Sequence, residues 1–182
     1  DLVIMVERTS FMFLTGPEVI KAVTGEVIDA EALGGSDVHT SVSGVAHFSV
    51  KTEKDALDLV RDYLSYLPSN NVENPPHIKP TDDPAYMDAS LNSIVPIDPS
   101  EPYIMHQVIE KIIDQGSFLE FQANWARNAI VGLARIGGYS VGIVGQEPAI
   151  MAGVIDIDAA DKMTRFVRMC DCFNIPLITF VD

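Results

Sequence analysis

The order of apolar and polar residues predicts an α/β chain in which short strands alternate with amphipathic helices. Residues 2–6 form an apolar run that is typical of a short buried strand. Gly16 and Pro17 then open a predicted helix, because proline at a first-turn position loses no hydrogen bond, and Gly25 ends it. Residues 42–50 alternate only loosely and contain Gly44, which predicts a turn that leads into a strand.

The clearest helix is expected between Thr52 and Pro68, where apolar residues recur at helical spacing. Thr52 and Asp55 resemble a capping box, although Asp replaces the usual Glu or Gln. Pro68 ends the helix because proline cannot continue it.

Residues 68–100 break the regular pattern, because prolines are spread through them with Asn and Asp between. So long a segment without regular structure is improbable inside one compact domain, so we expect a linker laid over two units. The predicted organisation is a first domain in residues 1–75, a Pro-rich linker in residues 76–100 and a second domain in residues 101–182. The prolines are Pro68, Pro75, Pro76, Pro80, Pro84, Pro96 and Pro99.

The second half of the chain predicts a βαβ unit. Apolar residues at 108–113 indicate a helix that ends at Gly116, and two strand-like runs follow at 129–134 and 141–144. Gly137-Gly138 between these runs suits a hairpin turn, since glycine accepts positive φ. A helical apolar stripe at 163–173 and an apolar run at 177–181 complete the pattern of a parallel βαβ unit. Ligands gather at the carboxyl ends of such strands, which here means Asp182.

Composition narrows the possible functions. The formal net charge of −14 argues against binding of nucleic acid or anionic membrane surfaces. No apolar run approaches the length of a membrane span, and no signal peptide is visible. Cys170 and Cys172 lie two positions apart in a predicted helix and so do not face each other. We interpret them as reduced thiols of a cytoplasmic protein.

Short blocks in both halves of the chain resemble the propionyl-CoA carboxylase β-subunit family, and they keep their order across the linker. In the first half they are Gly16-Pro17-Glu18-Val19-Ile20-Lys21, Val23-Thr24-Gly25-Glu26, Glu31-Ala32-Leu33-Gly34-Gly35, Ser43-Gly44-Val45-Ala46-His47 and Tyr66-Leu67-Pro68-Ser69-Asn70-Asn71. In the second half they are Val95-Pro96, Pro102-Tyr103, Ala134-Arg135, Val141-Gly142-Ile143-Val144, Ala152-Gly153, Arg165-Phe166-Val167-Arg168, Cys170-Asp171 and the run from Phe173 to Asp182.

The resemblance implies a fold of two crotonase-like (ClpP/crotonase) α/β domains in tandem, present here in part. It implies an internal fragment of the carboxyltransferase subunit of a biotin-dependent acyl-CoA carboxylase. Such a subunit moves a carboxyl group between N1 of biotin and the α-carbon of a short acyl-CoA such as propionyl-CoA. Backbone N–H groups at glycine-rich loops hold the enolate, because preorganised donors need little reorganisation.

The resemblance also implies partners. Biotin would be carried on a partner subunit or domain, supplied by a biotin carboxylase and its carrier, and acyl-CoA would be the substrate. The parent protein would be a homo-oligomer, a hexamer in the family, with no metal in this span, no nucleic acid and no direct membrane contact.

No catalytic residue is expected in this span, because the family's two oxyanion loops correspond to positions before Asp1 and after Asp182. The loop after the strand at 141–144 is a candidate edge of the biotin-side pocket, with Gln146, Pro148, Ala152 and Gly153 as its site residues. The family usually reads Asn-Gln-Pro at this loop. Here it reads Gly145-Gln146-Glu147-Pro148, which adds a carboxylate.

Several charged residues have simpler interpretations. His39, His47, His77 and His106 show no metal-ligand spacing and are expected to be surface or hydrogen-bonded histidines. Asp156, Asp158 and Asp161 precede or open a helix and suit capping and dipole compensation. Lys162, Arg165 and Arg168 could contact CoA phosphates or a partner, but a solvated helix face is favoured.

Two alternative functions stay open. The same fold serves in a biotin-dependent methylmalonyl-CoA decarboxylase or a transcarboxylase, which differ in their partner subunits. A non-catalytic crotonase-like scaffold is the alternative from another class.

If the catalytic loops lie outside this span, the isolated 182-residue chain is expected to be inactive. A purified preparation should show no biotin-dependent carboxyl transfer to or from acyl-CoA above a protein-free blank. Measurable transfer by the isolated chain would overturn the assignment of the catalytic loops to the flanking sequence.

Overall fold

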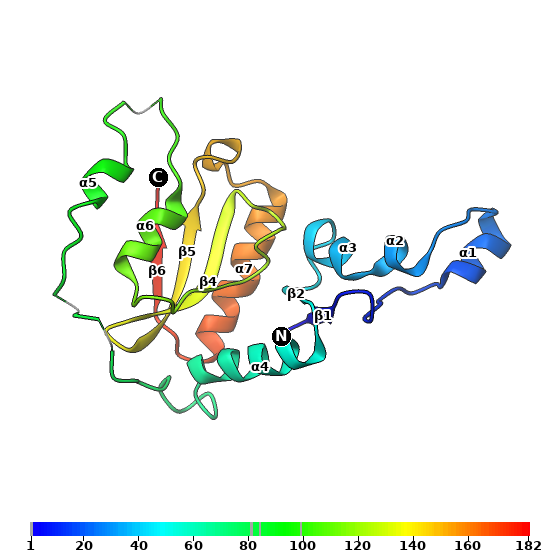
Figure 1. Ribbon diagram of the computed structural model, residues 1–182, viewed down its shortest axis with the longest axis horizontal. Coiled ribbons are helices and arrows are strands. Elements are labelled where there is room, and N and C mark those ends of the chain that lie inside the picture. The colour runs from blue at the N-terminus through cyan, green and yellow to red at the C-terminus, as the bar shows by residue number, and fades with distance from the viewer. Residues whose placement is uncertain (1, 81, 84, 99) are drawn as a thin grey trace. The chain divides into compact units, whose positions relative to one another are not determined.

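The structure, a computed structural model, describes residues 2–80, 82–83, 85–98 and 100–182 (Figure 1). The expectations for Asp1, Pro84 and Pro99 fall outside the described residues. By its contacts the chain divides into two units. The first consists of residues 1–61 and 122–125, and the second of residues 62–121 and 126–182. The helix α4 (Glu53–Tyr66) begins in the first unit and ends in the second.

The first unit is built on a pair of parallel strands, β1 (Ile4–Val6) and β2 (Phe48–Val50). The predicted strands at 2–6 and 42–50 therefore exist but are shorter. Gly44 makes the predicted turn, with a φ of 65°, and a Cβ there would collide with the Trp125 ring. Between the strands lie three helices: α1 (Pro17–Thr24), α2 (Ala30–Gly34) and α3 (Ser36–Ser41).

Helix ends in the first unit follow the local sequence signals. Pro17 is the first residue of α1, and Gly25 ends it in the left-handed conformation. Thr52 and Asp55 form the predicted capping box, in which each side chain accepts from the other's backbone N–H at 3.1 Å.

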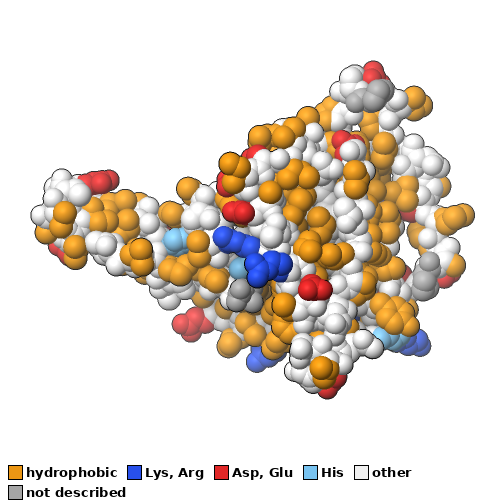
Figure 2. Space-filling view, turned by 180° about the vertical axis from the view of Figure 1, so that it is seen from behind, with side chains coloured by type: hydrophobic (Ala, Val, Ile, Leu, Met, Phe, Trp, Pro, Cys, Tyr) orange, Lys and Arg blue, Asp and Glu red, His pale blue; other side chains and the backbone are white. Residues whose placement is uncertain are grey.

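α1 has no buried residue, and the unit exposes large apolar side chains such as Phe11 and Phe13. Figure 2 shows hydrophobic side chains of this kind in orange.

A four-stranded sheet in the order β3-β4-β5-β6 forms the centre of the second unit. Its strands are β3 (Leu119–Glu120), β4 (Ala129–Ile136), β5 (Tyr139–Gln146) and β6 (Leu177–Phe180). β3, β4 and β5 pair antiparallel, whereas β5 and β6 are parallel. The helix α7 (Ile157–Cys172) connects β5 to β6, which confirms the predicted βαβ unit.

The sheet is covered on both faces, by α6 (Met105–Ile112) and by α7 (Figure 1). On the α6 face, Ile109 packs against Ile130 and Ile143, all with no exposed surface. On the α7 face, Gly142 leaves room for the helix, because a Cβ there would lie 2.7 Å from Cys170 Sγ. Burial on both faces explains why β4 and β5 are apolar runs rather than alternating ones.

One predicted helix end is wrong. α6 ends at Ile112 and not at Gly116, because Ile113 adopts an extended conformation and is buried in the core. Gly116, with a φ of 72°, belongs to the turn that follows. The hairpin turn is as predicted, since Gly137 and Gly138 have φ values of 57° and 82°.

The Pro-rich stretch includes the short helix α5 (Leu91–Ile94) and belongs to the second unit. Ile78 N donates to Gly138 O at 3.1 Å, so the stretch crosses the hairpin turn. The predicted domain limits, 1–75 and 101–182, refer to the domains of the parent protein and stay a prediction.

Arg135 in β4 joins distant segments of the second unit. Its guanidinium is buried, lies 4.3 Å from the centre of the Tyr66 ring and donates to Ser65 O at 2.8 Å. It also donates to Ser140 Oγ at 3.2 Å and to Pro76 O at 3.4 Å. One side chain therefore fixes the end of α4 and the start of the Pro-rich stretch against the sheet.

Gly138→Ala is expected to destabilise the full-length protein more than Gly116→Ala does. Both glycines have positive φ, which costs an alanine roughly 1–2 kcal/mol. Only at Gly138 would the new Cβ also overlap the Ile78 carbonyl, whereas Gly116 has no neighbouring atom within 4 Å. Urea denaturation should show an additional loss of about 1–3 kcal/mol for Gly138→Ala. Equal losses of unfolding free energy in the two variants would mean that the Ile78 carbonyl does not pack tightly against Gly138.

Candidate functional site

The segment made of the last residue of β5 and the loop that follows it, residues 146–153, carries all four site residues predicted from the sequence. We call it the β5 loop. Gln146 Nε2 donates a hydrogen bond of 2.8 Å to Gly153 O, which closes the loop on itself. Pro148 and Ala152 line a single pocket. The structure therefore brings the four residues together in one compact turn.

The end of the β5 loop, η1 (Met151–Gly153), has an unusual backbone. Met151, Ala152 and Gly153 have φ values of 52°, 51° and 65°, so three consecutive residues are left-handed. The left-handed conformation costs a residue other than glycine about 1–2 kcal/mol. Such conformations cluster at functional sites, where the surrounding structure holds them in place.

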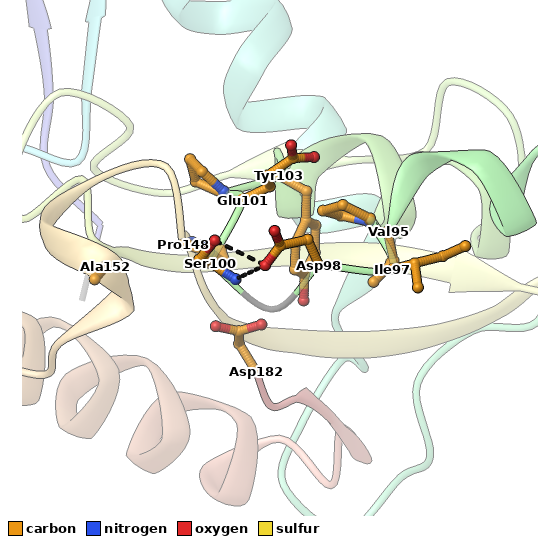
Figure 3. A pocket seen from close by; sticks show the side chains of 11 residues that line it. Val95, Ile97, Asp98, Ser100, Glu101, Tyr103, Pro148, Ala152 and Asp182 are labelled. Atoms are coloured by element: carbon orange, nitrogen blue, oxygen red, sulfur yellow. Dashed lines mark hydrogen bonds between the residues drawn. The ribbon is translucent and has the colours of Figure 1, made fainter.

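A pocket of about 420 Å³ lies between the β5 loop and the segment before α6 (Figure 3). Its walls combine apolar side chains with three carboxylates, those of Asp98, Glu101 and Asp182. Asp98 shapes one wall, because its Oδ1 accepts hydrogen bonds from Ser100 N at 2.9 Å and Ser100 Oγ at 2.7 Å. The lining residues are Val95, Pro96, Ile97, Asp98, Ser100, Glu101, Pro102, Tyr103, Pro148, Ala152 and Asp182.

The carboxyl end of β6 reaches the same pocket. Asp182 N donates to Gln146 Oε1 at 3.3 Å, so the Gln146 amide joins the β5 loop to the chain after β6. Because β5 and β6 are parallel, their carboxyl ends meet at one edge of the sheet, where ligands of α/β folds bind. The expected position of a ligand at Asp182 therefore coincides with the pocket.

Tyr103 is the titratable group of the pocket that is most affected by its surroundings. Partial burial, followed by the interaction with the Asp182 carboxylate and the negative charge of Glu147, raises the pKa of Tyr103 to about 12. The phenol therefore keeps its proton at neutral pH. Figure 3 shows Tyr103 and Asp182 on neighbouring walls of the pocket.

Glu147, the carboxylate that departs from the family pattern, does not line the pocket and is only 3% exposed. Its Oε1 accepts hydrogen bonds from Met105 N at 3.2 Å and Ala149 N at 3.3 Å. Met105 begins α6, and Ile104 before it has no side chain that can cap the helix. Glu147 therefore caps α6 from another element, a role that the local sequence does not reveal.

A family described as "Carboxyl transferase domain" matches residues 1–182, the whole chain. The chain belongs to this carboxyl transferase family.

Relatives of this carboxyl transferase chain include subunits of two different enzymes. It is 52% identical over 182 residues to the propionyl-CoA carboxylase carboxyltransferase subunit of Haloferax mediterranei. It is 50% identical over 182 residues to the methylmalonyl-CoA decarboxylase subunit alpha of Veillonella parvula. Each match covers 100% of this chain but only 35% and 36% of the relative. The chain thus spans about a third of the length of these relatives.

Solved structures agree with the fold. Transcarboxylase 12S, solved as a hexamer with methylmalonyl-CoA and methylmalonic acid bound, matches with a TM-score of 0.95 and 43% identity. That match covers 100% of this chain and 35% of the other. A single-chain, multi-domain long-chain acyl-CoA carboxylase matches with a TM-score of 0.82 and 27% identity, over 100% of this chain and 17% of that one. The predicted crotonase-like α/β fold and the family resemblance are confirmed.

Two further properties concern the described part of the carboxyl transferase chain. Each helix there is too short or too polar to cross a bilayer. Within residues 2–80, 82–83, 85–98 and 100–182, no three His, Cys, Asp or Glu side chains are grouped so that they could hold a metal ion.

The expectation of a solvated face is wrong for Lys162. Its side chain has no exposed surface, and Nζ donates to Ala129 O at 2.7 Å and Ala126 O at 3.3 Å. Burial lowers the pKa of Lys162 to about 8, although the nearby Glu120 carboxylate acts to raise it.

Arg165 and Arg168 are exposed, as expected. Asp156 caps α7 as predicted, since its Oδ1 accepts from Ala159 N at 2.9 Å.

Lys162→Met is expected to destabilise the full-length protein, because two carbonyls that accept from Nζ would lose that donor. A lost donor to a buried group costs about 1–3 kcal/mol, which the midpoint of urea denaturation at pH 7 should register. Arg168→Met, on the exposed side of the same helix, is the matched control and should change the midpoint little.

The stability difference between wild type and Lys162→Met should also depend on pH. The pKa of Lys162 is lower in the folded state than its ordinary value of 10.5. The cost of burying its charge is therefore present below pH 8 and is relieved as the pH rises from about 8 toward 10.5. The wild type should gain stability over the variant in that range. A difference that stays constant up to pH 10.5 would contradict a buried charge at position 162.

Proposed function

We propose that this chain is part of an acyl-CoA carboxyltransferase. The enzyme moves a carboxyl group between carboxybiotin and the α-carbon of a short acyl-CoA such as propionyl-CoA. The observation that carries the proposal is the pocket at the shared carboxyl ends of β5 and β6, in a chain 52% identical to a propionyl-CoA carboxylase subunit. The activity belongs to the full-length enzyme, because this chain covers only a third of its relatives' length.

The pocket suits the bicyclic ring of biotin. Its volume of about 420 Å³ is within the range of small-molecule sites, and such sites combine apolar walls with a few polar groups. Pro148 and Ala152 would contact the ring from the β5 loop. Gln146 and Gly153 would keep that loop in place through their hydrogen bond. Carboxybiotin would supply the carboxyl group, and N1 of biotin, once freed of that group, would accept the proton from the acyl α-carbon.

The role of this chain is then to bind and orient. Tyr103 holds its proton at neutral pH beside the Asp182 carboxylate, and both side chains line the pocket. Gln146 holds the Asp182 backbone and so sets where the chain continues. The backbone oxyanion loops that stabilise the enolate are proposed to lie in the flanking sequence of the full-length enzyme.

The assembly is proposed by analogy with the matched proteins. A biotin carboxylase with its biotin carrier would be the partner, and the enzyme would be a cytoplasmic homo-oligomer, a hexamer as reported for transcarboxylase 12S. We further propose that residues 1–75 and 101–182 belong to two crotonase-like domains joined by residues 76–100.

A biotin-dependent methylmalonyl-CoA decarboxylase is the second candidate, because one relative of this type is 50% identical. A transcarboxylase is a third, since the solved structure with a TM-score of 0.95 is of that type. All three would use this site and would differ in the partner that donates or accepts the carboxyl group.

The full-length enzyme is expected to transfer the carboxyl group of methylmalonyl-CoA to free biotin, with release of propionyl-CoA. Ala152→Trp should raise the KM for biotin by roughly tenfold or more, because the larger ring would occupy the pocket and an unfavourable contact of about 1.4 kcal/mol is a factor of ten. Val154→Trp is the matched control, since Val154 is 56% exposed and does not line the pocket.

Two results would count against the proposal. No transfer by the full-length enzyme would leave only a scaffold. Transfer with the same KM for biotin in wild type and Ala152→Trp would place biotin elsewhere.

A further inference from the structure

His106 of α6 lies between two carboxylates, one of which belongs to the β5 loop. Its Nδ1 is 2.9 Å from Glu147 Oε2, and its Nε2 is 3.0 Å from Glu120 Oε2. Glu147 belongs to the β5 loop and Glu120 to β3. One imidazole therefore connects three elements of the second unit.

A carboxylate only accepts hydrogen bonds, so with both glutamates ionised each ring nitrogen carries a proton. The hydrogen bond to Glu120, followed by that to Glu147, raises the pKa of His106 to about 9 against the opposing effect of partial burial. The bridge is an imidazolium with two ion pairs at neutral pH.

Glu147 connects His106 to the β5 loop. One of its oxygens pairs with His106, while the other accepts from Met105 N at the start of α6 and from Ala149 N within the loop. The Glu147 backbone N–H donates to Asn128 O at 3.0 Å. Glu147 is thus fixed through both its main chain and its side chain, and Pro148 follows directly.

We propose that His106 is a positioning residue: through its ion pairs with Glu120 and Glu147 it fixes the β5 loop, and with it the wall that Pro148 and Ala152 present to the biotin-side pocket. The inference rests on the proposed function for the identity of the ligand. The link between His106 and the loop geometry stands on the contacts alone.

Other titratable groups face this network from neighbouring elements. Lys162 of α7 interacts with Glu120, and Tyr103, in the segment before α6, interacts with Glu147. Lys162, Glu120, His106 and Glu147 thus alternate in charge. The Phe118 ring, 6.4 Å from the imidazole centre, is uncharged.

The direction of the pH dependence follows from His106. Its pKa is raised above the ordinary value of 6.5, so the ion pairs stabilise the loop fully below about pH 6.5. That stabilisation is lost as the pH rises through about 9. Above that range the neutral ring can donate only one hydrogen bond, and one carboxylate loses its partner.

The test compares His106→Asn and Glu147→Gln with wild type in the full-length enzyme. Glu147→Gln keeps the size of the side chain and an acceptor for Met105 N and removes the charge. The matched controls are His77→Asn and Glu110→Gln, because both residues lie outside the network and Glu110 is an exposed residue of α6.

Hydrogen exchange measured by mass spectrometry reads the position of the loop without any assay of activity. The amides of residues 146–153 are expected to exchange several-fold faster in both variants than in wild type or the controls. The amides of β4 that pair with β5 should be unchanged, because this ladder contains no residue of the bridge.

Kinetics with free biotin and methylmalonyl-CoA provide the second measurement. The KM for biotin should rise roughly tenfold or more in both variants, as expected for a small displacement of a binding wall. The KM for the acyl-CoA should stay within about twofold of the wild-type value. A merely structural role would change both constants or only the amount of folded enzyme.

The pH profile completes the test. The ratio of kcat/KM for biotin between wild type and His106→Asn should be greatest below pH 8 and fall toward one as the pH passes about 9.

The two hypotheses fail in different ways. Unchanged exchange of residues 146–153 in both variants overturns the positioning role, whatever the activity. An inactive wild type whose loop still loosens in the variants overturns the proposed function and leaves the positioning of the loop in place.

Discussion

The burial of β4 and β5 on both faces is the constraint on which the second unit depends. A strand between two helices cannot present polar side chains to water, so nearly every residue of both strands is buried. Gly142 lets α7 approach one face, while Ile109 of α6 packs on the other. Polar side chains can reach solvent or a ligand at the ends of these two strands, and the β5 loop starts at one of these ends.

The charged groups inside the second unit follow the same constraint. Lys162, Arg135 and Glu147 are buried, and each has oxygen or nitrogen partners at hydrogen-bonding distance. A buried charge without partners would be costly, so these side chains bond to carbonyls, hydroxyls or opposite charges. Each of them connects segments that are far apart in the sequence. The buried charges therefore hold these elements together rather than add net stability.

Local signals were sufficient where the structure is local. Pro17 and Gly25 bound α1, Thr52 and Asp55 cap α4, and the two glycines at 137–138 close the hairpin. The predicted site residues also proved to be neighbours, because they lie within eight positions of one another on a single turn. The family resemblance supplied the fold class, which periodicity alone did not distinguish from other α/β folds.

What could not be predicted depends on distant contacts. A helical pattern continues through Ile113, but the core draws this residue out of the helix. The charge of Lys162 suggested solvent, and only the carbonyls of residues 126 and 129 explain why the side chain is buried. His106 meets its partners 14 and 41 positions away, and no spacing rule covers such separations.

The contacts of Arg135 also determine when segments of the second unit can become fixed during synthesis. This guanidinium holds Ser65 and Pro76, which precede it by 70 and 59 positions. A ribosome adds roughly 5–20 residues per second, so the end of α4 and the Pro-rich stretch leave the ribosome several seconds before β4 does. During that interval their anchor does not yet exist, and the nascent segment is accessible to chaperones and proteases until the hairpin emerges.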